Sequence, residues 1–329
     1  MKSLLPSPMA TSSPTAVPQL VDGYGRHMRK LRVSLLEACN FRCFYCMPAA
    51  MRFAANPKQL SPTELHTICQ ALVSGGISQI RITGGEPTLR KDFREVISAL
   101  ASLPLEKLGM TSNGFLLEPH LPLLKALGCH YLNISLDSLQ ADNFNRMTRS
   151  MGFEKVMSSI LKAQQMGFQL KLNTVILRGE NDHELLDFVR FSEATGIEVR
   201  FLELMKIGMA RQFQPEAFIS AEEQISQIQS AFSLSPIAVE KDATAFSFQT
   251  QGGGKIGFIA SESRPFCGDC SRLRLSHDGK LRACLMLNQG RSLRNLSETE
   301  LLQVTRQVMA LKPFQRIESV AQNMYRIGG

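Results

Sequence analysis

The stretch "LRVSLLEACNFRCFYCMP" (residues 31–48) places a β-rich run directly before a loop that contains three cysteines. The run 31–36 predicts a strand, because its residues favour the pleated backbone. In an α/β barrel, the loop after a strand lies at the carboxyl-terminal face, where active sites are built. This stretch therefore predicts the first strand of a fold and the position of a site.

Strand and helix patterns alternate from this stretch to about residue 203. We predict strands at 31–36, 78–83, 106–112, 131–136, 168–176 and 197–204, and helices near 62–74, 91–102, 119–127, 153–166 and 182–194. Repeated strand–helix units imply parallel strands joined by right-handed crossovers. Six strands are fewer than the eight of a closed barrel, so we predict an α/β fold with a partial, TIM-like (β/α)6 barrel.

The pattern changes after about residue 215. A helix at 220–232 precedes short strands near 244–249, 255–260, 271–276 and 280–284, and a last helix covers 297–311. The stretch "QGGGKIG" lacks the phosphate-loop spacing and predicts a hairpin turn. The stretch "HDGK" (277–280) is a second turn signal between short strands. We therefore predict a disordered extension (1–20), the barrel (21–215) and a smaller α+β region (216–329) that covers the barrel mouth.

Composition narrows the function classes. The formal net charge is +8, but the arginines are spread along the chain, Trp is absent and Tyr occurs four times. The scattered arginines and the few ring side chains argue against a nucleic-acid surface. A small anionic substrate would explain the positive net charge equally well. No apolar run is long enough for a membrane span. We expect a cytoplasmic protein, in which clustered cysteines indicate metal rather than disulfides.

The first three cysteines have the spacing C-x3-C-x2-C, at Cys39, Cys43 and Cys46. Three thiolates can hold three irons of a [4Fe–4S] cluster and leave the fourth iron open for chemistry. Zinc is the next alternative, although it prefers paired C-x2-C units, and simple burial is the last.

The motif "CNFRCFYCMP" resembles the signature of the radical S-adenosylmethionine (SAM) superfamily. From about Leu31 to Gly329, the chain resembles the GTP 3′,8-cyclase (MoaA) family of molybdenum cofactor biosynthesis. The resemblance implies that Cys39, Cys43 and Cys46 bind a [4Fe–4S] cluster whose open iron chelates SAM. It also implies SAM contacts at Tyr45, Gly85, Ser135 and Met205 and GTP contacts at Arg32, Arg81, Thr111, Lys171, Arg272 and Arg274.

Most of these residues also have a plain structural interpretation. Thr111, Ser135 and their neighbours Ser112 and Asp137 could cap helices. The charged residues could face solvent, Met205 could fill the core, and the "GG" of "RITGGEP" (81–87) permits any tight turn.

A second set, Cys267, Cys270 and Cys284, has the spacing C-x2-C-x13-C. The spacing alone leaves zinc and an iron–sulfur cluster open. The resemblance implies a second [4Fe–4S] cluster whose open iron binds the guanine base. It also implies that the terminal Gly328 and Gly329 extend into the active site and are needed for the reaction. Cys69 and Cys129 are expected to be buried structural thiols.

The family's reaction is the cyclisation of GTP to (8S)-3′,8-cyclo-7,8-dihydroguanosine 5′-triphosphate. The resemblance further implies an external electron donor and a downstream pyranopterin-forming enzyme, and a homodimer is compatible with the sequence. Two departures concern the site: Glu37-Ala38 stands where Asp-Arg is common, and Gln79 where lysine is often found. Another radical SAM enzyme acting on a peptide and a zinc-containing nucleic-acid module are the alternatives.

Overall fold

The computed structural model describes residues 19–53 and 58–327. The predicted disordered extension therefore lies almost wholly outside the described residues, as do Gly328 and Gly329. No helix in the described part of the chain has the length and apolar character needed to cross a membrane.

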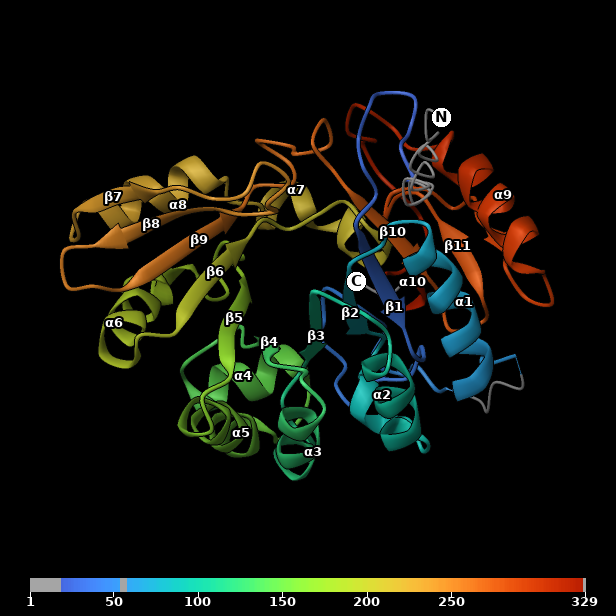
Figure 1. Ribbon diagram of the computed structural model, residues 1–329. Helices are drawn as coiled ribbons and strands as arrows, with labels where there is room; N and C mark the ends of the chain where they lie inside the picture. The colour runs from blue at the N-terminus through green and yellow to red at the C-terminus, as the bar shows by residue number, and fades with distance from the viewer. Residues whose placement is uncertain (1–18, 54–57, 328–329) are drawn as a thin grey trace, which may run out of the picture.

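A parallel sheet forms the first part of the fold (Figure 1). Its strands are β1 (Lys30–Ser34), β2 (Gln79–Thr83), β3 (Lys107–Ser112), β4 (Tyr131–Ser135), β5 (Gln169–Val175) and β6 (Glu198–Leu202). Each strand pairs in parallel with the next, in chain order. The six predicted strands and the partial barrel are confirmed.

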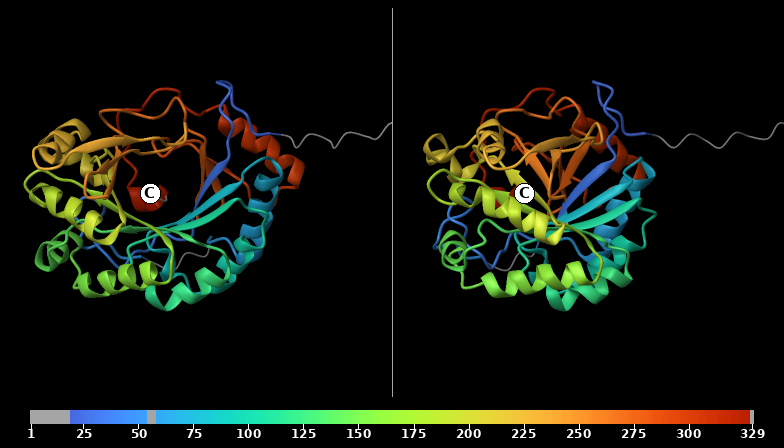
Figure 2. Two further views of the ribbon diagram at one scale, coloured as in Figure 1. Left: turned by 60° about the vertical axis from the view of Figure 1, so that its left-hand side comes forward. Right: turned by 90° about the vertical axis from the view of Figure 1, so that its left-hand side faces the viewer.

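Helices cover the outer face of this curved sheet (Figures 1 and 2). They are α1 (Pro62–Ser74), α2 (Phe93–Ala101), α3 (Leu121–Ala126), α4 (Ala141–Thr148), α5 (Phe153–Gln165) and α6 (Leu185–Thr195), with 3-10 turns η1 (Pro87–Leu89), η2 (Glu118–His120) and η3 (Asp182–Glu184). The start of α1 is fixed locally, because Ser61 and Glu64 form a capping box and Pro62 occupies the first turn. The sequence patterns missed α4, which buries only Phe144, Met147 and Thr148.

The C-terminal region extends the same sheet at both ends. Its elements are η4 (Gly208–Gln212), α7 (Gln214–Ala217), α8 (Ala221–Gln229), β7 (Leu234–Ile237), β8 (Phe246–Thr250), β9 (Lys255–Ile259), β10 (Arg272–Leu275), β11 (Lys280–Arg282), β12 (Arg291–Ser292), α9 (Glu298–Met309) and α10 (Met324–Ile327). Strand β10 pairs in parallel with β1, and β9 pairs in parallel with β6. Within the described residues the strand order is β12-β11-β10-β1-β2-β3-β4-β5-β6-β9-β8-β7.

The two faces of the sheet differ in chemistry. Alternate residues such as Leu170 and Leu172 of β5 are buried under the outer helices, whereas Lys171 and Asn173 face the inside. Polar and charged side chains therefore border an interior cavity, in place of the packed side-chain layers of a closed barrel. Helix α10 lies inside the curve of the sheet (Figure 2).

Three local predictions are confirmed. The "QGGGKIG" stretch joins the antiparallel strands β8 and β9 as a hairpin turn. The "HDGK" turn joins β10 and β11, with Gly279 in the left-handed region at φ 84°. Cys69 and Cys129 are fully buried.

Candidate active site

One cavity of about 820 Å³ occupies the inside of the curved sheet. It is bordered by every described residue for which the sequence predicted a catalytic, metal, SAM or GTP role. These residues are Arg32, Cys39, Cys43, Tyr45, Cys46, Arg81, Gly85, Thr111, Ser135, Lys171, Met205, Cys267, Cys270, Arg272, Arg274 and Cys284. The predicted site residues thus share one cavity, although they come from opposite ends of the chain.

The loop that carries the first three cysteines is held by its own backbone and by one arginine. The amide of Cys46 donates to the Cys43 carbonyl at 2.9 Å, which forms a turn between two of the thiols. Arg42 donates to the carbonyls of Cys39 at 2.5 Å and Met51 at 3.0 Å. No sequence pattern singled out Arg42, because its partners are backbone groups of an irregular loop.

Gly85 lies directly against the cysteine loop. A Cβ atom at this position would be 2.2 Å from the Ala38 carbonyl oxygen and 2.4 Å from that of Glu37. The Gly85 amide also donates to the Leu36 carbonyl at 2.8 Å. Close backbone packing is thus a sufficient reason for glycine here, alongside the predicted SAM contact.

The glutamate that follows, Glu86, connects two strand-end loops. It is fully buried, and its carboxylate accepts hydrogen bonds from Thr88, from the Ser112 hydroxyl at 2.8 Å and from the Asn113 amide at 2.7 Å. Asn113 in turn donates to the Cys39 sulfur at 3.6 Å. The polar residues of "MTSNG" therefore support the cysteine loop. The helix-capping alternative is not observed, because the following helices have Leu117, His120 and Gln140 at their N-caps.

Asp137, at the end of β4, orients Tyr45. The Tyr45 hydroxyl donates to the Asp137 carboxylate at 2.5 Å, and the Val175 amide donates to its other oxygen at 2.9 Å. Burial raises the pKa of Asp137 to about 6, although both hydrogen bonds oppose the shift. Asp137 therefore orients Tyr45, a contact that the helix-capping interpretation did not predict.

The first cysteine set fits a cluster better than a single metal ion. All eight cysteines lie in the described ranges and are free thiols. Burial, with a smaller contribution from neighbouring ionisable groups, raises the pKa of Cys39 to about 11 and that of Cys46 to about 12. Metal ligation deprotonates such thiols outright.

No group of three or more His, Cys, Asp or Glu side chains among residues 19–53 and 58–327 is arranged to hold a metal ion. A [4Fe–4S] cluster takes its three thiolates at separate irons, so its ligands need not converge on one point. The result is therefore compatible with cluster ligation by Cys39, Cys43 and Cys46.

The second cysteine set has a different electrostatic environment. The Cys270 amide donates to the Cys267 carbonyl at 3.2 Å, and Arg272 lies 3.5 Å from the Cys270 sulfur. Burial alone would raise the pKa of Cys270, but the charges of Arg272 and Lys312 lower it to about 6. Cys284 follows β11, which pairs with β10, so the hairpin brings it to the same end of the cavity. This trio also suits thiolate ligation.

Strand register explains how the predicted GTP-binding cations meet. In the parallel pairings, Arg32 is level with Arg274 on one side and with Arg81 on the other. Neighbouring strands are about 4.8 Å apart, so three guanidiniums form a row that faces the cavity. Burial and the neighbouring arginines lower the pKa of Arg32 well below its usual range, and burial lowers that of Arg81 to about 10.

Arg32 has no hydrogen-bond or ion-pair partner anywhere in the described part of the chain. Its guanidinium nevertheless borders the cavity. An unpaired cation among like charges is a strong indication of an anionic ligand.

The next row contains one of the departures from the family pattern. Arg272, Lys30, Gln79 and Lys107 are level with one another on adjacent strands. Gln79 therefore lies between two lysines that both border the cavity. The lysine that is often found at this position would be a third cation between them.

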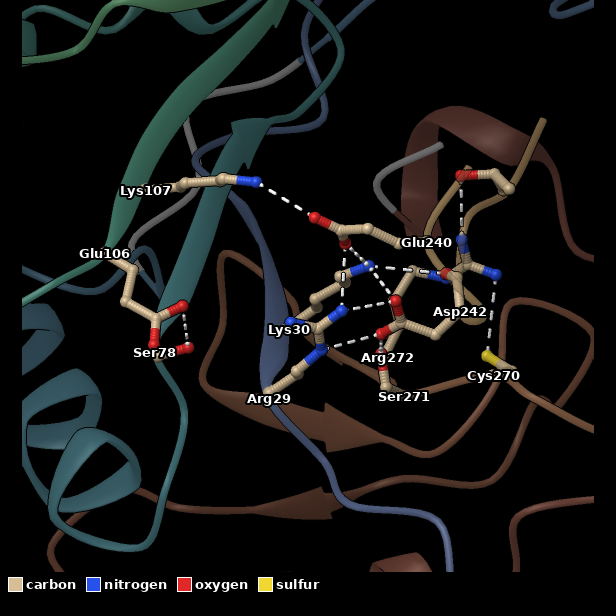
Figure 3. A network of polar contacts seen from close by, with 11 residues as sticks. Arg29, Lys30, Ser78, Glu106, Lys107, Glu240, Asp242, Cys270, Ser271 and Arg272 are labelled. Carbon is tan, nitrogen blue, oxygen red and sulfur yellow. Dashed lines mark hydrogen bonds and ion pairs between the residues drawn. The ribbon is translucent and has the colours of Figure 1, made fainter. Parts of the chain in front are cut away.

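An acidic loop between β7 and β8 crosses to this row (Figure 3). Asp242 accepts from Arg29 at 2.5 Å and from Lys30 at 2.7 Å, and Glu240 contacts Lys107 at 3.3 Å. The sequence did not indicate these pairs, because their members are 133 or more residues apart.

Arg200 and Glu198, on β6, also border the cavity, although no sequence pattern predicted them as site residues. Glu198 contacts Lys171 and Arg200, each at 2.6 Å. Gly257 of the neighbouring β9 makes room for Arg200, since a Cβ there would lie 3.2 Å from Arg200 Cγ. The alternating charges of "IEVRFLEL" were the available signal, but their inward direction requires the sheet.

Comparisons with known proteins now identify the family. Residues 33–192 match the Radical SAM superfamily, and residues 197–317 match the family described as Molybdenum Cofactor Synthesis C. The chain is 46% identical to the GTP 3′,8-cyclase of Synechocystis sp. over 94% of this chain and 95% of the relative. The chain belongs to the GTP 3′,8-cyclase family. The cyclase of Aquifex aeolicus is 35% identical, over 85% of this chain and 89% of that relative.

The solved structures agree on the fold. Streptococcus suis SuiB bound to S-adenosylmethionine aligns with a TM-score of 0.59 at 12% identity, over 82% of this chain and 64% of SuiB. Family membership confirms the predicted radical SAM enzyme class, the role in molybdenum cofactor biosynthesis and the use of SAM with iron–sulfur clusters. The match to Molybdenum Cofactor Synthesis C counts against the peptide-modifying alternative.

Proposed function

We propose that this cavity holds GTP between two cysteine-ligated [4Fe–4S] clusters and catalyses cyclisation to (8S)-3′,8-cyclo-7,8-dihydroguanosine 5′-triphosphate. The observation that carries the proposal is the row of Arg274, Arg32 and Arg81, which lies in the same cavity as both cysteine sets. A triphosphate is the kind of ligand that rewards several forked donors pointing one way.

At one end, Cys39, Cys43 and Cys46 would hold the first cluster, with SAM against Tyr45, Gly85, Ser135 and Met205. When bound, the reduced cluster and SAM supply the radical that removes the hydrogen from the ribose 3′ carbon. The chain's own contribution is to position the reactants and exclude water. The Asp137–Tyr45 hydrogen bond and the buried Glu86 fix the two loops that border this end.

At the other end, Cys267, Cys270 and Cys284 would hold the second cluster, whose open iron takes the guanine base. Arg32, Arg81, Lys171, Arg272 and Arg274 would bind the triphosphate, with Thr111 as a polar contact. Burial and the neighbouring arginines lower the pKa values of Arg32 and Arg274, and bound phosphate would relieve the repulsion among these cations.

The remaining assignments extend the proposal beyond the cavity. We place the protein in the cytoplasm, where free thiols persist. An external electron donor reduces the first cluster, and a pyranopterin-forming enzyme consumes the product. A homodimer and a catalytic role for Gly328 and Gly329 complete the proposal. Met324 and Tyr325, which precede these glycines, already border the cavity.

Anaerobic equilibrium binding of GTP to the reconstituted protein tests the substrate assignment. GTP should bind more tightly than ATP, because only guanine offers the base contact proposed at the second cluster. Substitution of Arg272 or Arg274 by alanine should weaken both nucleotides through the shared triphosphate. Equal affinity of the unsubstituted protein for GTP and ATP would overturn the placement of guanine at the second cluster.

A further inference from the structure

Lys312 is a buried cation beside the second cysteine set. It lies in the loop that follows α9, and only 4% of its surface is exposed. Its ammonium group donates to the carbonyls of Arg272 at 2.7 Å and Ala283 at 2.8 Å. No carboxylate pairs with it among the described residues. A buried charge without a counter-ion is unfavourable, so this position requires an explanation.

The two carbonyls belong to the segments that carry the thiols. Arg272 follows Cys270 by two residues, and Ala283 directly precedes Cys284. Lys312 also borders the same cavity as Cys270 and Cys284, where its charge would attract their thiolates. One ammonium group thus connects the two separate segments that supply these ligands.

The third ligand is tied to the same loop by Arg26, which precedes β1. Its guanidinium donates to the carbonyls of Cys267 at 2.6 Å, Pro313 at 2.9 Å and Lys312 at 3.2 Å. Asp22 holds Arg26 through a 2.7 Å hydrogen bond to Nε. The three cysteines of the second set are therefore connected through Lys312 and its neighbours.

We propose that Lys312 is a positioning residue of the second cluster: it holds the Cys270 and Cys284 segments together and offsets the thiolate charge, so that the cluster stays bound. This inference rests on the proposed presence of a cluster at that site. Hydrogen bonds and charge near cluster sulfurs set reduction potentials, and a nearby cation favours the reduced form. Lys312 should therefore also raise the cluster's potential.

The test uses the full-length chain with Cys39, Cys43 and Cys46 replaced by serine, so that iron reports on the second set alone. K312M, K312Q and K312R are made in this background. K241M is the matched control, because Lys241 contacts Asp269 of the same cysteine loop at 3.6 Å but is 89% exposed. Each protein is reconstituted anaerobically, without GTP or SAM, and its folding is checked by circular dichroism.

Two readouts are measured: iron retained against a chelator and the midpoint potential of the cluster. K312M should retain iron about 10- to 100-fold less well, whereas K312R and K241M should behave as the background protein does. K312Q keeps an uncharged N–H donor group, so it should retain more iron than K312M but show a lower potential than the background.

Equal iron retention and potential in folded K312M and K241M would overturn the proposal. An unchanged potential in K312Q would overturn its electrostatic part, even if K312M fails to fold. If the background protein itself binds no iron, the second cluster of the proposed function fails, and that outcome is distinct from any difference among the Lys312 variants.

Discussion

Asp242 joins the acidic loop between β7 and β8 to the start of β1, and its replacement by asparagine (D242N) should destabilise the fold measurably. Its carboxylate accepts from Arg29 at 2.9 and 2.5 Å, from Lys30 at 2.7 Å and from the Ser271 hydroxyl (Figure 3). Only 10% of the Asp242 side chain is exposed. These contacts connect one end of the long sheet to the β1–β10 pair, across the opening of the partial barrel.

The magnitude follows from the kind of contacts that are lost. Hydrogen bonds to charged groups contribute about 1.5–3 kcal/mol each, and removal of one partner from a buried pair costs about 3–5 kcal/mol. Arg29 and Lys30 are 36% and 19% exposed, so solvent screening reduces these values. We therefore expect D242N to lower the free energy of unfolding by about 2–3 kcal/mol.

Burial alone would raise the pKa of Asp242, but Arg29, Lys30 and Ser271 lower it well below the usual range. A carboxyl with a lowered folded-state pKa stabilises the protein above its unfolded-state pKa of about 3.9 and loses that effect as the pH falls through the folded-state value. The difference between D242N and the parent should thus stay constant from about pH 5 to 8.

Anaerobic unfolding in guanidinium chloride measures this difference. E240Q is the matched control in the same loop. Glu240 is 49% exposed, so its loss should cost about 0–1 kcal/mol. If D242N costs no more than E240Q, the Asp242 contacts do not hold the loop in place and the reasoning is wrong.

Three further predictions concern the site. G85A should lose the iron of the first cluster, because the added Cβ would lie 2.2 Å from the Ala38 carbonyl oxygen; iron content after reconstitution checks this. R32A should raise the KM for GTP about tenfold or more, because a charged hydrogen bond contributes about 1.5–3 kcal/mol. It should not lower stability, because Arg32 has no partner among the described residues. Steady-state kinetics measures the first effect and unfolding the second. G208A should reduce turnover while both clusters stay bound, because its Cβ would lie 2.2 Å from Asn323 Oδ1 and displace the segment that leads to the C-terminus.

Matched controls separate these effects from general damage. Gly23 and Gly253 have no atom within 4 Å of an added Cβ. G23A should therefore keep the first cluster. Gly253 has a positive φ of 89°, and Gly208 one of 53°, so G253A should lose some stability but keep its turnover. Equal iron loss in G85A and G23A, or equal turnover in G208A and G253A, would contradict the packing argument. R211A is the control for R32A: Arg211 is exposed, so its loss should leave the KM for GTP unchanged.

Local signals predicted much of the fold, and the reason is visible in particular elements. Helix α1 occupies the predicted range 62–74, because Ser61, Pro62 and Glu64 define its start within four residues. Helix α4 was missed, since polar residues dominate its short sequence. The parallel pairings of β10 with β1 and of β9 with β6 had no local signal, because their partners are distant in the chain.

The same distinction applies to the site. The spacing of Cys39, Cys43 and Cys46 is local and indicated its chemistry directly. Lys312 and Asp242 act on residues 29 or more positions away, so their functions appear only after the chain has folded. Glu86 lies inside a motif that the sequence singled out, but its partners on the next strand-end loop could not be predicted from that motif.

The most direct test of the central claim is GTP-dependent formation of 5′-deoxyadenosine under anaerobic conditions. The protein is reconstituted with iron and sulfide, supplied with SAM and a strong reductant, and assayed with GTP, with ATP and without nucleotide. A two-cluster GTP cyclase should form 5′-deoxyadenosine together with a cyclised nucleotide only when GTP is present. Equal formation with ATP, or none from protein that carries both clusters, would contradict the account.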